Sequence, residues 1–381
     1  MKTTYVFASL LALLVGCEPL DVPQSPTEPC SPVSYANHPR HQTYLTELQQ
    51  YRQKSNAPGS ILLIQKPGEP RWIGAVGKSN LEHQTDIQVC DQFRVGSITK
   101  MFVAVAALKL QEQGKLRFDD RLATLLPGTA DRIPQADQIT LRHLLSHTSG
   151  IVDPPNESIA YQLSIVDDYQ ERFSLTTGQL LTKYVYGKSL HFAPGSGWSY
   201  SNANYWLLGQ IIEQKTGQRL HDVLDDWIFR PLGMNDTYLE VRDDRNVVRG
   251  YADLYGNGRL YDVSHWDRAD SDGEADGGII STAADLATFA DALFNGKLLT
   301  ESALSEMIKP TLLPTCPNGD CEYGLGVEHW KTGLGTAYGH NGGSVGIEAN
   351  LLFFPKNKGI FVLYKNNGNG SDKSLMDRVM P

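Results

Sequence analysis

Apolar runs at the two ends of the chain predict the strands of a β-sheet. Near the start, Gly59 to Gln65 and Arg71 to Gly77 are separated by the turn Pro67 to Pro70, a pattern typical of a hairpin. Four further runs near the end have strand character: Tyr323 to Trp330, Ala337 to Gly343, Ile347 to Phe354 and Gly359 to Lys365. We therefore expect one sheet that draws its strands from both ends of the chain.

The middle of the chain has the apolar spacing of helices. From about Leu116 to Leu298 this spacing recurs, with examples at Leu141 to Leu145, Tyr205 to Gln214 and Asp285 to Phe294. Other helices are expected near residues 39–56, from Ser97 to a stop at Gly114, and over Asp372 to Val379, where the last would cover one face of the sheet.

These elements predict an α/β (α+β) protein whose antiparallel sheet is flanked by helices and interrupted by a mainly helical lobe. We expect a globular domain over residues 38–381, with an α/β lobe formed by 38–115 and 299–381 and a helical lobe formed by 116–298. With 41% hydrophobic residues the chain can form a packed core. Its formal net charge of −9 argues against nucleic acid as a partner.

The first 37 residues predict export and anchoring. Lys2 and the apolar run Tyr5 to Val15 are typical of a signal peptide that is too short to span a bilayer. The segment Leu14 to Cys17 resembles a bacterial lipoprotein box, so we expect residues 1–16 to be removed and Cys17 to be lipidated, with ordinary cleavage as the alternative. Prolines recur through residues 17–37, which predicts an extended stalk. The expected location is the periplasmic side of the bacterial envelope, anchored at the outer membrane.

The odd number of cysteines agrees with lipidation of Cys17. The chain has five cysteines, and setting Cys17 aside leaves four that can pair in three ways. We favour Cys316 with Cys321, across a short loop, and Cys30 with Cys90. A metal site built from these four residues is the alternative, but no Cys-x-x-Cys spacing is present and an exported protein meets oxidising conditions. We expect no metal and no cofactor.

The main candidate for chemistry is Ser97, which lies three residues before Lys100. Residues three apart are neighbours on a helix, so the Lys100 amine can reach the Ser97 oxygen. The apolar run Met101 to Leu108 indicates burial, which lowers a lysine pKa and makes the neutral amine available as a base. The serine also lies at an expected helix N-terminus, where backbone N–H groups favour negative charge. Alone, however, Ser-x-x-Lys is weak evidence, and a helix cap followed by a surface lysine explains it better.

A second candidate group is Tyr200-Ser201-Asn202. It follows the rigid turn Phe192 to Gly195 and precedes an amphipathic helix, so it is expected on a fixed loop. A phenol beside a lysine can carry a proton, and an asparagine side chain can bind a substrate carbonyl. The same Tyr-x-Asn pattern recurs at Tyr35, Tyr255 and Tyr364, in contexts that are less suited to a site.

The third group is His340-Asn341-Gly342-Gly343, expected at the start of a strand. Glycines in a strand let a substrate approach the backbone closely. The N–H groups of Gly343 and Ser97 could together form an oxyanion hole, in which each donor is worth roughly 3 to 4 kcal/mol of barrier.

Five motifs in order resemble the class C-like branch of the serine β-lactamase / D-Ala-D-Ala carboxypeptidase superfamily. The motifs are Phe93 to Lys100, Leu144 to Gly150, Phe192 to Gly195, Tyr200 to Asn202 with Leu207-Leu208-Gly209, and Gly339 to Gly343. The resemblance implies that Ser97 is the acylated nucleophile and that Lys100 and Tyr200 share the acid and base work. It also implies that Asn202 orients the acyl group and that His340 stands where many relatives have the lysine of Lys-Thr-Gly.

The resemblance implies a serine acyl hydrolase that acts on D-Ala-D-Ala peptides, β-lactams or esters. The histidine favours a D-Ala-D-Ala carboxypeptidase of the penicillin-binding type or an esterase, because dedicated β-lactamases usually carry lysine there. Asn341 departs from the commoner threonine, which weakens any inference about carboxylate recognition. The alternatives are a class C-like β-lactamase and, in another class, an inactive lipoprotein that binds wall peptides.

Three other patterns have simpler structural explanations. Lys331-Thr332-Gly333 is a literal Lys-Thr-Gly, but a hairpin turn explains it better because no long strand follows directly. The run Gly342 to Gly346 matches the Gly-x-Ser-x-Gly nucleophile elbow, yet a strand and no later histidine follow it. His143 and His147 are four residues apart without the glutamate of a His-Glu-x-x-His metal site, so we expect a structural role for that turn.

Overall fold

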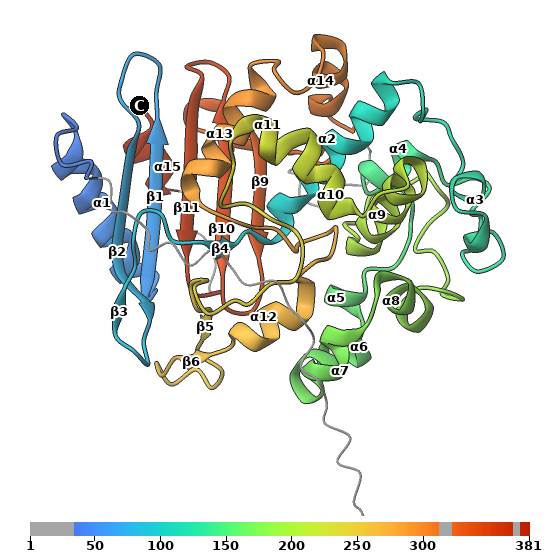
Figure 1. Cartoon of the computed structure of the whole chain (residues 1–381), viewed down its shortest axis with the longest axis horizontal. Coiled ribbons are helices and arrows are strands. Elements are labelled where there is room, and N and C mark those ends of the chain that lie inside the picture. The colour runs from blue at the N-terminus through green and yellow to red at the C-terminus, as the bar shows by residue number, and fades with distance from the viewer. Residues whose placement is uncertain (1–33, 312–321, 369–373) are drawn as a thin grey trace, which may run out of the picture.

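The computed structural model describes residues 34–311, 322–368 and 374–381. A seven-stranded antiparallel sheet in the order β3-β2-β1-β11-β10-β9-β8 forms its centre (Figure 1). The strands are β1 (Gly59–Gln65), β2 (Trp72–Asn80), β3 (Thr85–Asp86), β8 (Glu328–Thr332), β9 (Gly335–Gly343), β10 (Glu348–Phe354) and β11 (Gly359–Lys365). The predicted fold class is therefore confirmed.

The two ends of the chain meet in the middle of the sheet. Strand β1 pairs with β11, so that Leu63 lies opposite Val362. Every residue of β10 and β11 is buried, and so is β1 up to Ile64. Because helices cover both faces of these strands, their sequences are continuous apolar runs rather than alternating ones.

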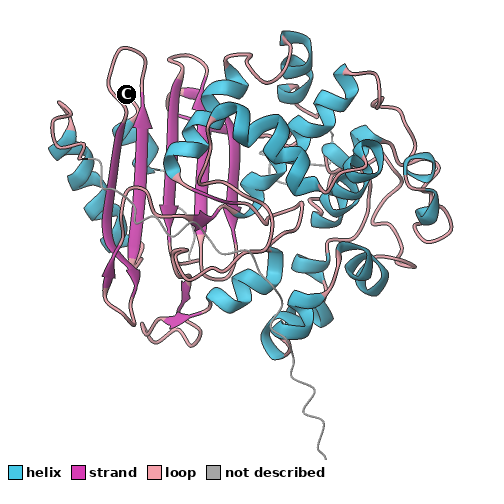
Figure 2. Ribbon diagram, viewed as in Figure 1, coloured by secondary structure: helices cyan, strands magenta, loops and turns pink. Residues whose placement is uncertain are grey.

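Alternate residues of β1 point into two separate cores. Leu62 and Ile64 join a cluster with α1 (His41–Lys54) and α15 (Ser374–Val379), which cover one face. Ile61 and Leu63 join the larger cluster with α2 (Thr99–Glu112) and α13 (Ala283–Phe294) on the other face. This division follows from the two-residue period of a strand, and Figure 2 shows the helices on either side of the sheet.

Most of the remaining helices form a lobe beside the sheet (Figure 1). The remaining helices are α3 (Leu122–Leu125), α4 (Leu141–Leu145), α5 (Pro154–Glu157), α6 (Ile159–Asp167), α7 (Tyr169–Ser174), α8 (Thr177–Tyr184), α9 (Asn202–Thr216), α10 (Leu220–Leu224), α11 (Arg230–Leu232), α12 (Ser264–Ser271) and α14 (Glu301–Ile308), and of these α11 contacts α13. Two short ladders, β4 (Phe93–Arg94) with β7 (Ile280–Ser281) and β5 (Tyr251–Ala252) with β6 (Tyr261–Asp262), are separate from the large sheet. Helix α13, which the sequence assigns to the helical lobe, packs on the sheet instead.

One predicted strand is displaced. The sequence predicts a strand from Tyr323 to Trp330, whereas β8 begins at Glu328. The chain turns at Gly326, whose φ is +75°, so that Tyr323 folds back and forms an isolated bridge with Glu328. A period-two pattern does not reveal such a reversal, because both arms of the turn keep strand-like composition.

Several predictions concern residues outside the described ranges. The signal peptide, Cys17 and most of the stalk lie before residue 34. Each predicted cysteine pair also includes at least one residue there or in 312–321, so the pairings stay predictions. Within the described ranges, no helix combines the length and apolar character needed to cross a bilayer.

Candidate active site

Ser97 lies in a 3-10 turn, Gly96–Ile98, directly before α2. The sequence predicts a helix N-terminus at this point, and the structure inserts this turn ahead of it. Gly96 has φ of +54°, in the left-handed region that side chains rarely adopt. A Cβ on Gly96 would also lie 2.8 Å from the nitrogen of Gly343. Glycine at this position therefore lets the turn carrying Ser97 lie against the end of β9.

The end of β9 depends on a second glycine. A Cβ on Gly342 would lie 1.8 Å from the carbonyl oxygen of Val95 and 3.0 Å from the nitrogen of Ser97. No side chain can occupy that space without moving the backbone. The two glycines thus bring the backbones of Ser97 and Gly343, the predicted pair of oxyanion donors, to the same place.

Lys100 lies under Ser97 in the first turn of α2 and is fully buried. Its Nζ is 3.0 Å from Ser97 Oγ, 2.7 Å from Asn202 Oδ1 and 2.7 Å from the carbonyl oxygen of Asp276. Burial lowers the pKa of Lys100 to about 8, although Asp276 and other carboxylates oppose the change. Asn202 Oδ1 and the Asp276 carbonyl oxygen can only accept hydrogen bonds. The two protons of a neutral Lys100 amine therefore bind these two oxygens, and the amine lone pair faces the Ser97 hydroxyl.

His147 fixes the loop that carries Tyr200. The two rings stack with their centroids 4.3 Å apart, and His147 Nδ1 accepts a hydrogen bond from the Ser201 backbone at 3.1 Å. Burial holds the pKa of His147 well below its usual value, so the ring is neutral and able to accept. The histidine thus has the structural role that the sequence predicts for this turn.

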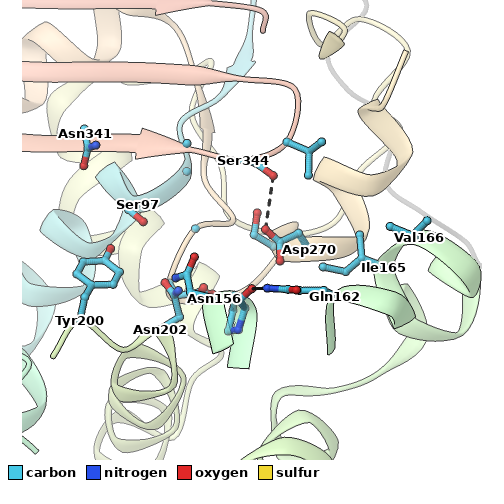
Figure 3. Close-up of a pocket in the computed structure, with 17 residues that line it drawn as sticks. Ser97, Asn156, Gln162, Ile165, Val166, Tyr200, Asn202, Asp270, Asn341 and Ser344 are labelled. Atoms are coloured by element: carbon cyan, nitrogen blue, oxygen red, sulfur yellow. Dashed lines mark hydrogen bonds between the residues drawn. The ribbon is translucent and has the colours of Figure 1, made fainter. Parts of the chain in front are cut away.

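The Tyr200 hydroxyl is buried and faces Ser97 (Figure 3). It makes no hydrogen bond to the described residues, yet Ser97 is close enough to lower its pKa. Burial has the larger effect and raises the pKa of Tyr200 well above its usual value. Lys100 Nζ lies 4.8 Å from the centre of the Tyr200 ring. The phenol therefore stays protonated and lies beside both partners of the nucleophile.

His340 lies inside β9, not at the start of a strand as the sequence predicts. It is fully buried, with Nε2 3.0 Å from the Tyr323 hydroxyl and Nδ1 2.5 Å from the Asn341 carbonyl oxygen. Burial lowers the pKa of His340, and Lys100 lowers it further while Glu328 opposes them. Both ring nitrogens are engaged with protein atoms, so His340 supports the wall of the site rather than facing its opening.

A cavity of about 550 Å³ opens beside Ser97 (Figure 3). Of the predicted site residues, Ser97, Tyr200, Asn202, Asn341 and Gly343 line it, whereas Lys100, His340 and Gly342 lie behind. Helices α5, α6 and α12 and the loop after β9 complete the wall with residues outside the five motifs: Asn156, Gln162, Ile165, Val166, Asp270, Ser344 and Val345. Their positions depend on how separate helices pack, and no spacing in the sequence indicates that.

The three other patterns have structural roles. Lys331-Thr332-Gly333 is at the β8–β9 turn, where Thr332 Oγ1 donates to the Gly335 carbonyl at 2.7 Å. The run Gly342 to Gly346 leads into β10, a strand, and so is no nucleophile elbow. His143 forms a capping box with Thr140 at the start of α4.

The comparisons with known proteins agree with this fold. A profile described as Beta-lactamase matches residues 46–380, so the chain belongs to the Beta-lactamase family. It is therefore a serine hydrolase of the group that includes β-lactamases and penicillin-binding proteins.

Individual relatives in this family carry different names. A penicillin-binding protein of Bacillus subtilis is 27% identical over 82% of this chain and 69% of its own length. Esterase EstB of Burkholderia gladioli is 33% identical over 50% of this chain and 49% of its own. Among solved structures, a D-amino acid amidase from Ochrobactrum anthropi has a TM-score of 0.76 at 26% identity, covering 89% of this chain and 97% of the amidase.

Proposed function

We propose that the chain hydrolyses small amide or ester substrates through an acyl-enzyme on Ser97. The contact between Lys100 Nζ and Ser97 Oγ, at 3.0 Å beside an open cavity, carries the proposal. A lysine whose pKa is near 8 has a substantial neutral fraction at neutral pH, so it can take the serine proton. The relatives named as penicillin-binding protein, esterase and amidase give further support.

Acylation begins when neutral Lys100 takes the proton of Ser97 Oγ. The oxygen then bonds to the substrate carbonyl carbon, and the carbonyl oxygen becomes an oxyanion that accepts hydrogen bonds from the N–H groups of Ser97 and Gly343. Collapse of this intermediate breaks the bond to the leaving amine or alcohol. The leaving group takes the proton back from Lys100, by way of the Tyr200 hydroxyl.

Deacylation reverses these roles. A water molecule attacks the acyl carbon and gives its proton to the Lys100 and Tyr200 pair. The tetrahedral intermediate collapses, the bond to Ser97 Oγ breaks, and Oγ recovers its hydrogen. Asn202 binds Lys100 Nζ through Oδ1 while its backbone and Nδ2 bind Asp153 Oδ1, so the amine keeps its direction through both steps.

Among the finer activities, an amidase or esterase fits the site better than a D-Ala-D-Ala carboxypeptidase. A carboxypeptidase substrate has a carboxylate next to the scissile bond, and among the described residues that line the cavity none is Lys, Arg or His. His340 is buried, with both nitrogens bonded to other groups. Of the two activities that the sequence favours, a carboxypeptidase or an esterase, we therefore retain the esterase and add amidases, whose substrates have an uncharged leaving group.

We also propose that the enzyme acts in the bacterial envelope, held to a membrane by lipid on Cys17. Support comes from the sequence alone, through the signal-like segment and the box ending at Cys17. Metabolic labelling with an alkynyl fatty acid tests this: label on the wild-type protein and none on Cys17→Ala is expected. Equal labelling of both proteins would contradict it.

Steady-state turnover tests the activity. The purified protein is assayed with p-nitrophenyl butyrate, phenylalanine amide, a peptide ending in D-Ala-D-Ala and a penicillin. We expect turnover of the ester or the amide, loss of that activity in Ser97→Ala, and full activity in Ser174→Ala, whose hydroxyl bonds to the Glu171 carbonyl in α7. Turnover that survives in Ser97→Ala would contradict the proposal. If only the peptide or the penicillin were hydrolysed, the proposed preference for amides or esters would be wrong.

A further inference from the structure

The cavity beside Ser97 has negative side chains and, among the described residues that line it, no positive ones. Asp270 and Asp276 contribute the two carboxylates, and the other lining residues are neutral. Two cations lie behind this wall. Lys100 is buried under Ser97, and Arg172 is buried against the Tyr161 hydroxyl. A substrate that enters the cavity therefore meets carboxylates and no exposed cation, which favours a positively charged group.

Asp270 is held with its carboxylate toward the cavity. Tyr161 donates a hydrogen bond to Oδ1 at 3.1 Å, and Arg172 fixes the backbone by donating to the Asp270 carbonyl at 2.8 Å. The other oxygen, Oδ2, has only a long 3.5 Å contact with the Ser344 hydroxyl (Figure 3). Oδ2 is thus able to accept a shorter hydrogen bond from a ligand.

The pKa of Asp270 is raised overall, because burial has the largest effect. Arg172, the hydrogen bond from Tyr161 and Lys100 oppose this change and favour the ionised carboxylate. Asp276 already accepts a hydrogen bond from Trp206 Nε1 at 2.8 Å, and burial raises its pKa to about 6. Asp276 is thus tied through Oδ1 to helix α9, whereas Asp270 Oδ2 has only the long contact with Ser344.

An apolar surface continues from Asp270 to the mouth of the cavity. Ile165 and Val166 of α6 lie beyond Asp270 as seen from Ser97 (Figure 3), and Val345 of the β9–β10 loop also lines the cavity. Val166 is 46% exposed and Val345 43% exposed. An apolar side chain of a substrate would cover these valines, which gives a favourable change in free energy of about 25 cal/mol for each Å² buried.

We propose that Asp270 binds the ammonium group of the acyl part of the substrate, so that the enzyme selects amides or esters of apolar amino acids with a free amino group. This inference rests on the proposed acyl hydrolysis at Ser97. The ammonium donates to Asp270 Oδ2, the side chain packs against Ile165, Val166 and Val345, and the carbonyl carbon faces Ser97. An N-acylated substrate or an anionic one gains no such contact.

Ligand binding to the Ser97→Ala protein tests this without relying on turnover. Calorimetry compares phenylalanine amide with N-acetylphenylalanine amide, each as D and L enantiomers. We expect the free-amine ligand of at least one enantiomer to bind about tenfold or more tightly than its acetylated form, as for a hydrogen bond between charged groups. In Ser97→Ala with Asp270→Asn, which keeps the acceptor for Tyr161, the ratio should fall to about twofold. Asp253→Asn, in an exposed loop, should keep it.

Each other outcome overturns the inference. Equal or tighter binding of the acetylated ligand, an unchanged ratio in Asp270→Asn, or no detectable binding of the free-amine ligand at millimolar concentration would each contradict it. These results leave the acyl-enzyme untouched, because Ser97-dependent turnover of p-nitrophenyl butyrate is measured separately on the wild-type protein. If p-nitrophenyl butyrate were hydrolysed equally fast by Ser97→Ala, the proposed function itself would be overturned.

Discussion

Asp153 Oδ1 accepts two hydrogen bonds from Asn202, one from its backbone and one from Nδ2, each 3.0 Å long. With Nδ2 bound to Asp153, the amide of Asn202 can turn only Oδ1 toward Lys100, and that contact is 2.7 Å. The other oxygen of Asp153 is bound by Asn156 Nδ2 at 2.6 Å. Asp153 thus acts through Asn202 and is a positioning residue for the lysine.

Replacing Asp153 by alanine should lower kcat/KM for p-nitrophenyl butyrate by about 10- to 100-fold. Hydrogen bonds to charged groups contribute about 1.5 to 3 kcal/mol, and Asn202 would be free to rotate away from Lys100. Steady-state kinetics measures the loss, with Asp253→Asn as the control. Asp153→Asn should recover part of the activity, because an asparagine oxygen still accepts from Asn202. Wild-type kinetics in Asp153→Ala would contradict this role.

Gly342→Ala should remove most activity and destabilise the fold. The new methyl would lie 1.8 Å from the Val95 carbonyl oxygen, so β9 must move away from the turn that carries Ser97. Overpacking of this kind costs about 1 to 3 kcal/mol of unfolding free energy. Urea denaturation and ester turnover measure the two effects. The matched control, Gly128→Ala, has no atom within 4 Å of the new methyl. Equal behaviour of the two variants would refute the close approach.

The activity should rise with pH through about 8. The base is neutral Lys100, whose pKa burial lowers to about 8, so kcat/KM for a neutral ester should increase about tenfold per unit well below pH 8 and level off above it. Burial raises the pKa of Tyr200 far above this range and lowers that of His340 below its usual value, so neither produces the rise. A profile that is flat or falls between pH 6 and 8 would contradict a lysine base.

Tyr323→Phe should lower the unfolding free energy by about 1 to 3 kcal/mol. It removes the 3.0 Å contact between the Tyr323 hydroxyl and His340 Nε2, leaving a buried nitrogen without that partner. Urea denaturation at neutral pH measures the change, and Tyr255→Phe on an exposed loop is the control. If both variants unfold like the wild type, the buried contact is not stabilising.

The sequence predicts most of the sheet and the contact between Ser97 and Lys100 because those features are local, whereas Tyr200 and Gly343 are associated with Ser97 only through the family resemblance. Strands β1 and β11 have their predicted bounds, since each is one apolar run between turn residues. Ser97 and Lys100 share one helical turn, so a spacing of three is enough to predict that they meet.

The parts that the sequence does not predict depend on packing between distant segments. Asp153 and Asp270 lie in stretches with no motif, and only the packing of α5, α9 and α12 brings Asp153 to Asn202 and Asp270 to the cavity. The burial of His340 likewise results from the turn at Gly326, which brings Tyr323 over the ring. Its position behind the cavity wall, not in the opening, shifts the proposed substrate away from carboxylates.

Localising the acyl group tests the central claim most directly. The protein is mixed with p-nitrophenyl butyrate, quenched in acid within the first turnovers, digested, and its peptides are examined by mass spectrometry. A butyryl group on Ser97 of the wild-type protein, and none on any peptide of Ser97→Ala, is the predicted result. A butyryl group on another residue that is released as fast as the product forms, or one that persists in Ser97→Ala, would contradict the account.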